Sequence, residues 1–160
     1  MTESNNTSSG KHYADHLASY LAKHYDTKGL DIYREVSVGK SIIGKNRRVD
    51  ILAVARDGSR AVAIECKFQD SQGTADEKIP YAIDDLRAMG MPAILTYAGG
   101  GFSEGVSHML AACPIAAYCN PGPTLDRGRE TRELDVQMAM IFGWWDALLT
   151  GKARVMPPPG

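Results

Sequence analysis

Hydrophobic residues recur with two different periods in the first part of the chain. From Lys11 to Asp26 they return every three or four positions, which predicts an amphipathic helix. Asp31 to Val38 instead alternates, with Ile32, Arg34 and Val36 on one side, and this period of two predicts a strand. The chain therefore begins with a helix followed by a strand.

The stretch from Arg47 to Lys67 alternates in two arms of similar length around Asp57 and Gly58. Asp-Gly between two alternating arms is typical of a β-hairpin. With the turn centred on this pair, Asp50 falls opposite Glu65, and facing residues point to the same side of a sheet. Nearer the turn both sides of the hairpin are apolar, whereas Arg48 faces Lys67 next to the acids, so the sequence predicts two acids held together at a charged, open end.

Five further elements follow, and turn residues separate them. They are a helix over Gly73–Met89 with Thr74 and Glu77 as a capping box, a strand over Pro92–Tyr97, a helix over Ser103–Ala112, an edge strand over Ile115–Cys119 and an apolar helix over Glu130–Leu149. Strands grouped early, followed by helix and strand in turn, predict an α/β domain with a central mixed sheet flanked by helices. We expect residues 1–10 to be disordered, 11–150 to form one domain and 151–160 to be a flexible, proline-rich tail.

Two close carboxylates repel each other, and partial burial strengthens the repulsion. A hard divalent cation such as Mg²⁺ or Mn²⁺ takes oxygen ligands and would compensate Asp50 and Glu65, with the carbonyl oxygen of Cys66 as a further ligand. Lys67 and Gln69 continue the same alternation, so both are candidates to orient an attacking water. The alternative is an ion-pair cluster at a solvated end of the sheet.

The composition adds few constraints. The 160 residues carry a net charge of −1, so a nucleic acid would have to be bound by a local basic patch. The candidate patch precedes Asp50 and includes four basic residues and no acid, and Lys78 follows at the next helix start. These candidate nucleic-acid contacts are Lys40, Lys45, Arg47, Arg48 and Lys78.

The cysteines and histidines do not indicate a zinc site. Three cysteines without paired spacing fit reduced thiols, and the polar start of the chain does not resemble a signal peptide, so we expect a cytoplasmic protein. No apolar run is long enough to span a bilayer. His12 and His16 share a helix face, but no third ligand follows them.

Asp50 followed by Glu65-Cys66-Lys67 across a hairpin resembles the PD-(D/E)xK nuclease superfamily, which includes restriction endonucleases and Holliday junction resolvases. The resemblance implies a restriction-endonuclease-like core, a metal held by Asp50 and Glu65, and a catalytic Lys67. Val49 stands where the family name has proline. Many members add an acid from the first helix; Asp15, or Glu35 on the first strand, are the acids available here.

The sequence thus predicts a Mg²⁺-dependent endonuclease that hydrolyses DNA phosphodiester bonds with structure-selective or weak sequence specificity. The alternative is a catalytically inactive protein of the same fold that binds nucleic acid or serves in assembly. The apolar helix over 130–149 could form the core or cover a homodimer interface. The sequence does not decide between DNA and RNA or name the target.

Overall fold

The computed structural model describes residues 3–71 and 75–160, and the side chains of residues 10–71 and 76–160. Its elements, in chain order, are α1 (Glu3–Tyr25), a 3-10 turn (Asp26–Lys28), β1 (Leu30–Lys40), β2 (Asn46–Ala55), β3 (Ala61–Phe68), α2 (Ala75–Arg87), β4 (Ala93–Ala98), α3 (Glu104–Ala112), β5 (Ala116–Tyr118), a 3-10 turn (Arg129–Thr131), α4 (Arg132–Phe142) and α5 (Asp146–Leu149). The expected cap residue Thr74 lies outside the described residues.

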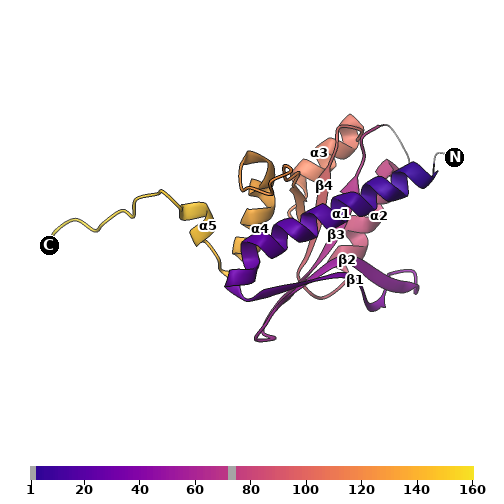
Figure 1. The fold of residues 1–160 in the computed structure, drawn as a ribbon. Helices are drawn as coiled ribbons and strands as arrows, with labels where there is room; N and C mark the ends of the chain where they lie inside the picture. The colour runs from indigo at the N-terminus through magenta and orange to yellow at the C-terminus, as the bar shows by residue number, and fades with distance from the viewer. Residues whose placement is uncertain (1–2, 72–74) are drawn as a thin grey trace.

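One mixed sheet has the strand order β1-β2-β3-β4-β5 (Figure 1). The first three strands pair antiparallel, and β3, β4 and β5 pair parallel. This arrangement confirms the predicted α/β class. The predicted hairpin register is also confirmed, because Val54 pairs with Ala61 and Ile51 pairs with Ile64.

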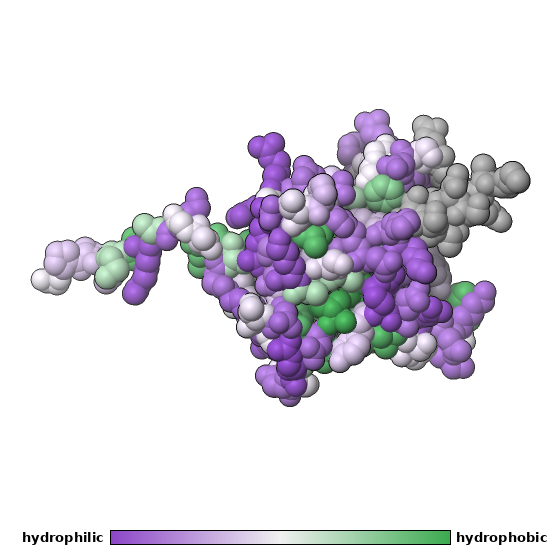
Figure 2. Space-filling model, viewed as in Figure 1, coloured by the Kyte–Doolittle hydropathy of each residue, from purple (hydrophilic) through white to green (hydrophobic). Residues whose placement is uncertain are grey.

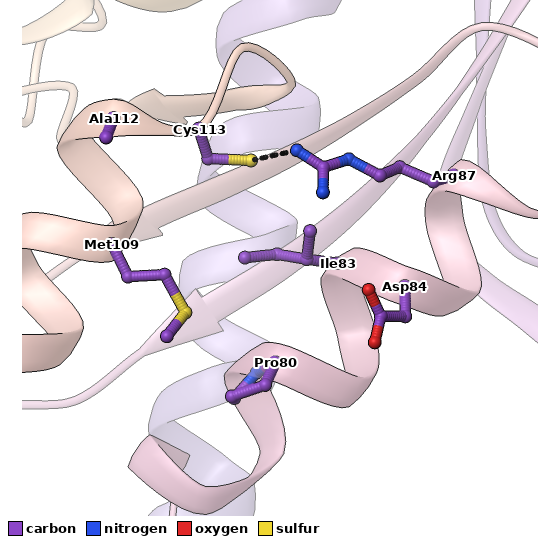
Figure 3. A pocket seen from close by; sticks show the side chains of 7 residues that line it. All are labelled: Pro80, Ile83, Asp84, Arg87, Met109, Ala112 and Cys113. Carbon is purple, nitrogen blue, oxygen red and sulfur yellow. Dashed lines mark hydrogen bonds between the residues drawn. The ribbon is translucent and has the colours of Figure 1, made fainter.

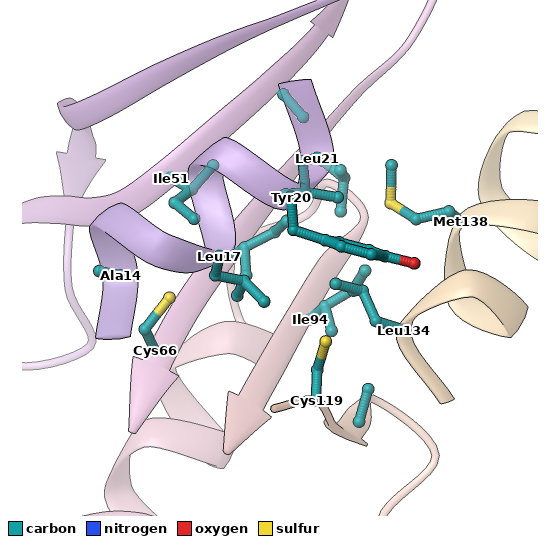
Figure 4. Packing of buried hydrophobic residues seen from close by; sticks show 14 of the residues in the cluster. Ala14, Leu17, Tyr20, Leu21, Ile51, Cys66, Ile94, Cys119, Leu134 and Met138 are labelled. Atoms are coloured by element: carbon teal, nitrogen blue, oxygen red, sulfur yellow. The ribbon is translucent and has the colours of Figure 1, made fainter. Parts of the chain in front are cut away.

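Two hydrophobic clusters fill the space on either side of the sheet. The larger cluster packs α1 and α4 on residues such as Ile51, Cys66 and Ile94 (Figure 4). The smaller cluster packs α2 and α3 around Leu95. The helices thus cover both faces of the parallel strands, as the burial of such strands requires.

A buried polar cluster joins α1 to α4. The Asp135 carboxylate accepts hydrogen bonds from the Tyr20 hydroxyl at 2.7 Å and the Tyr25 hydroxyl at 2.6 Å. Arg127 Nε lies 3.7 Å from the same carboxylate, and its guanidinium stacks over the Tyr25 ring. Buried carboxylates are stable only with such partners, so this cluster fixes how the two helices meet.

Both ends of the chain differ from the sequence-based expectation. Helix α1 begins at Glu3, not Lys11, because a helix once nucleated extends through polar residues at little cost. The expected helix over 130–149 is interrupted at Gly143, whose φ of 78° closes α4 in a left-handed cap. Trp144 then stacks on Tyr25, so part of the apolar surface is covered within this chain.

The last residues, 152–160, have no helix or strand and extend away from the body (Figure 1). The face of the body seen in Figure 2 is mainly hydrophilic, with a hydrophobic patch near its centre. All three cysteines are free and buried. Within residues 3–71 and 75–160, no helix combines the length and apolar character that a membrane crossing needs.

Candidate active site

The two predicted acids lie where the β2–β3 ladder stops. Pairing ends at Ile51 and Ile64, so Asp50 and Glu65 are not a ladder pair, contrary to the register extended from the turn. Asp50 Oδ2 instead accepts a hydrogen bond from the Cys66 backbone N–H at 2.8 Å. The carboxylate of Asp50 therefore reaches β3 next to Glu65.

Glu65 and Lys67 lie on one face of β3, as the alternation predicted. Lys67 Nζ donates to Glu65 Oε1 at 3.1 Å, and both side chains are about one-fifth exposed. Burial raises the pKa of the Glu65 carboxyl; Lys67 opposes this shift, and the charge of Asp50 adds to it. The burial of the Glu65 carboxylate and its repulsion with Asp50 carry an electrostatic cost that Lys67 offsets only in part. A second cation bound at Glu65 and Asp50 would therefore lower this cost.

A cavity of about 300 Å³ opens beside these groups. Its lining includes Glu65 and Lys67, together with four of the five predicted nucleic-acid contacts, Lys45, Arg47, Arg48 and Lys78. Tertiary structure thus brings the acid–lysine pair and a set of cations to one place. Lys40 is exposed at the end of β1 and is not part of this lining.

Arg47 has a different environment from the other basic residues. Its guanidinium forms hydrogen bonds with the Asp85 carboxylate at 2.9 and 3.2 Å, and the two side chains are only 10% and 15% exposed. These bonds lower the pKa of the Asp85 carboxyl, which also accepts the Ile42 N–H. Arg47 therefore fastens the β1–β2 loop to α2 while lining the cavity, and its contact with nucleic acid stays a prediction.

Gln69 does not extend the active face as predicted. Strand β3 ends at Phe68, and Gln69 is 1% exposed beneath the loop that follows β4. Its Nε2 donates to the carbonyl of Gly101 at 2.8 Å. A Cβ at Gly99 would lie 2.2 Å from the Gln69 carbonyl oxygen, so the two chain segments touch at the backbone. This contact buries Gln69 instead of presenting it to the cavity.

Arg34 is a site residue that the sequence analysis did not single out. Its guanidinium donates to the backbone carbonyl of Asp50 and, through Nε, to the Asp15 carboxylate at 2.9 Å. The β1–β2 ladder pairs Arg34 with Ile51 and Val36 with Val49. An arginine on the same strand side as Ile32 and Val36 was the available signal, because such a position normally holds an apolar residue.

The spare acids are engaged elsewhere. Asp15 is bound to Arg34, whereas Glu35 receives a hydrogen bond from Arg48 at 2.7 Å. Glu35 has a φ of 56°, a strained backbone conformation for a residue other than glycine. Among the described residues, no three His, Cys, Asp or Glu side chains form a metal-binding group. Neither spare acid therefore joins Asp50 and Glu65 in a three-residue ligand set.

A second cavity of about 290 Å³ lies between α2 and α3 (Figure 3). Ile83 and Met109 line it, and Arg87 donates to the Cys113 sulfur at 3.8 Å. None of the predicted catalytic residues lines this cavity. The candidate site is therefore the cavity at Glu65 and Lys67.

Comparison with known proteins assigns the family. A model of the PD-(D/E)XK nuclease superfamily domain matches residues 9–145. The chain belongs to this superfamily. No curated protein matches.

Two solved structures are similar to part of this nuclease-superfamily member. One is a protein of unknown function, with 21% identity and a TM-score of 0.42. The other is a repair endonuclease from Pyrococcus abyssi, with 20% identity and a TM-score of 0.38. Each match covers 64% of this chain but only 56% and 44% of the other chains, respectively.

Proposed function

We propose that the protein is a Mg²⁺- or Mn²⁺-dependent endonuclease that hydrolyses DNA phosphodiester bonds with structure-selective or weak sequence specificity. One observation carries the proposal: Glu65 and Lys67 share a cavity with Lys45, Arg48 and Lys78. Phosphodiester hydrolysis needs an acid-bound metal and a positioned water, and DNA binding needs cations along the phosphate backbone.

The donor set fits a hard divalent cation. Asp50 and Glu65 supply carboxylate oxygens, and Cys66, whose carbonyl is the further ligand, directly follows Glu65 in the chain. Mg²⁺ commonly takes one or two protein carboxylates and completes its shell with water and substrate phosphate, so a third acid is not required. Burial raises the pKa of the Cys66 thiol, which keeps it protonated and unsuited to soft metals. When bound, the metal supplies Lewis-acid activation of the phosphate and of water.

Each side chain of the site has a separate role in the proposed reaction. Asp50 and Glu65 hold the charge that fixes the metal, and the Glu65–Lys67 contact places the ammonium at the same point. Lys67 then orients the attacking water and offsets charge on the phosphate. The water oxygen forms a bond to phosphorus as the bond to O3′ breaks, and the water proton passes to solvent while O3′ is protonated. The products are a 5′-phosphate and a 3′-hydroxyl.

The basic side chains are the proposed DNA contacts. Lys45, Arg48 and Lys78 line the cavity, and Lys40 extends the patch along β1. Such contacts bind phosphates without reading bases, which fits weak sequence specificity. The alternative is an inactive member that only binds nucleic acid, and the paired Glu65 and Lys67 argue against it.

The test is a cleavage time course with Mg²⁺ or Mn²⁺ on supercoiled plasmid, linear duplex, single strands and a four-way junction. We expect products that EDTA abolishes and that Lys67→Ala reduces by roughly 10²–10⁴-fold, the usual contribution of a proton-transferring or water-orienting group. Lys152→Ala, at an exposed position in the tail, is the matched control. DNA binding without cleavage by the folded wild-type protein would instead support the inactive alternative.

Assembly and location are also proposals. The exposed apolar side chains of Met140, Trp145 and Leu149 could support a homodimer. Analytical ultracentrifugation over a range of concentrations would test this. The three free, buried cysteines favour the cytoplasm, where thiols stay reduced.

A further inference from the structure

The loop between β1 and β2 presents two isoleucines to solvent. Ile42 is 51% exposed and Ile43 is 61% exposed. They occupy the two central positions of a turn that the Gly44 N–H closes onto the Ser41 carbonyl at 2.9 Å. The tip of this turn is therefore both exposed and apolar.

Neither turn chemistry nor solubility explains this choice of residues. Central turn positions favour glycine, proline, asparagine, aspartate and serine, whereas isoleucine is β-branched and favours strands. Two adjacent exposed isoleucines also cost hydration free energy. Sequences that break local rules in this way do so mainly at functional sites.

The loop holds its isoleucines outward. The Asp85 carboxylate accepts the Ile42 N–H at 3.0 Å, and Arg47 binds the same carboxylate. The Ser41 N–H also donates to the Lys45 carbonyl at 2.7 Å across the loop. These contacts fix the base of the loop on α2, so little conformational entropy is lost when the tip enters a partner.

The basic residues around the tip and its two exposed isoleucines together favour a partner that is anionic and also has apolar surface. Residues 39–48 contain four basic side chains and no acid. Arg47 and Arg48 are paired with Asp85 and Glu35, so Lys40 and Lys45 supply the net positive charge beside the tip. Ser41 and Lys45, which flank the tip, line the same cavity as Glu65 and Lys67. Nucleic acid with accessible bases offers both phosphate charge and apolar base faces. An anionic membrane offers charge and apolar chains as well, but the shared cavity with the acid–lysine pair favours nucleic acid.

We propose that Ile42 and Ile43 form a wedge that enters DNA where base stacking is already broken, at branches, mismatches or single-strand junctions. Apolar side chains that insert between base steps unstack them and kink the duplex. Insertion costs least where stacking is already lost, so the wedge selects distorted DNA. This inference rests on the proposed nuclease function and names the substrate class of the same site.

The test measures unstacking directly. A duplex carries 2-aminopurine beside a three-way junction, and a perfect duplex carries it in the same sequence. Binding is followed with EDTA present, which separates unstacking from cleavage. We expect wild-type protein to raise the fluorescence of the junction substrate and to bind it more tightly than the perfect duplex. The double variant Ile42→Ser, Ile43→Ser should lose the fluorescence change and roughly 10- to 100-fold of junction affinity.

The control removes exposed apolar residues elsewhere, in the tail. Val155→Ser with Met156→Ser should leave both readouts unchanged, because these side chains are 91% and 68% exposed and lie outside the helices and strands. Circular dichroism checks the folding of each variant. Conservative Ile42→Val, Ile43→Val should retain most of the signal, because two apolar side chains remain.

Three outcomes would overturn the wedge. They are equal binding of junction and perfect duplex, a fluorescence rise that survives in the serine variant, and loss of binding to phosphatidylserine vesicles as the main effect of that variant. Cleavage in Mg²⁺ separates the two proposals. If wild-type protein cuts DNA but the serine variant shows unchanged substrate preference, the wedge fails and the nuclease stands. If wild-type protein binds junctions with unstacking but never cuts, the nuclease fails and the binding inference stands.

Discussion

The two ends of the β2–β3 hairpin use their acids in opposite ways. At the turn, Asp57 accepts hydrogen bonds from the backbone N–H and the hydroxyl of Ser59 at 2.8 and 2.6 Å. This acid completes the turn that its own sequence predicts. At the other end, pairing has stopped, and Asp50 lies against the Cys66 N–H beside Glu65.

The comparison shows that Asp57 stabilises the turn, whereas Asp50 and Glu65 are available for chemistry. Hydrogen bonds within its own turn stabilise Asp57, and it is exposed to water. Burial and a neighbouring acid destabilise the charge of Glu65. Folding alone does not require a buried carboxylate next to a second acid. The electrostatic cost of charged Glu65 at the open end of the hairpin therefore indicates a functional role.

The largest expected effect comes from removing one charge at each end. Asp50→Asn keeps an oxygen to accept the Cys66 N–H but removes the charge of a proposed metal ligand, so cleavage should fall by roughly 10²–10⁴-fold. Asp57→Asn makes the same chemical change at the turn and should leave the rate unchanged. Initial rates on a common plasmid substrate, with melting curves for both variants, measure this contrast. Equal losses of rate would contradict the division between the two ends.

Glycine to alanine at each end gives the next effect. In Gly99→Ala the new Cβ would lie 2.2 Å from the Gln69 carbonyl oxygen, and φ is 96°. We expect a loss of about 3 kcal/mol in the free energy of unfolding from overlap and backbone strain. Gly58→Ala has a φ of 73° with open space around the Cβ, so its cost should be about 1 kcal/mol. Urea denaturation compares the two, and similar midpoints would argue against the tight contact.

Two arginines provide a third contrast. Arg34 bonds the Asp50 carbonyl near the site, and Arg56 bonds Asp31 at 2.9 Å near the turn. Arg34→Gln should raise the Mg²⁺ concentration needed for half-maximal cleavage by about 10–100-fold, the usual effect of losing a group that positions a metal ligand. Arg56→Gln should not change it. Arg34→Lys should recover part of the effect, whereas a purely structural role would alter melting temperature alone.

The smallest expected effect is a pH dependence of opposite sign at the two ends. Burial raises the pKa of Glu65, so without metal the folded state holds that proton more tightly and stability falls as pH rises from the ordinary to the raised value. Ser59 lowers the pKa of Asp57, whose contribution is present above its ordinary pKa and is lost as pH falls through the lowered value.

Glu65→Gln should therefore raise the melting temperature near neutral pH, and Asp57→Asn should lower it slightly. Melting curves from pH 3 to 8 with EDTA present test both signs. A lower melting temperature for Glu65→Gln at neutral pH would mean that its ion pair with Lys67 outweighs burial.

The hairpin shows what the sequence predicts well. Asp-Gly sets the turn, and alternation then determines which residues face each other from Val54 to Ile51. The same alternation correctly placed Glu65 and Lys67 on one face. It could not predict where pairing stops, because this depends on the Asp50 side chain reaching the Cys66 N–H across strands.

The other differences also depend on distant contacts. Arg47 looked like a loop cation, but Asp85 on α2 binds it, and the sequence separation of 38 residues conceals that pairing. Gln69 looked like a continuation of the strand until the loop after β4 covered it. Gly143 was visible within the last predicted helix and, as a common left-handed helix end, could have divided it.

The polar cluster at Asp135 has a consequence for biosynthesis. It joins Tyr20 near the start of the chain to a residue 115 positions later. Translation delivers the partners of Tyr20 only when α4 has left the ribosome, long after the β2–β3 hairpin has emerged. Until then one side of α1 is without its final neighbour, so a nascent chain cannot complete this nuclease fold before synthesis is nearly finished.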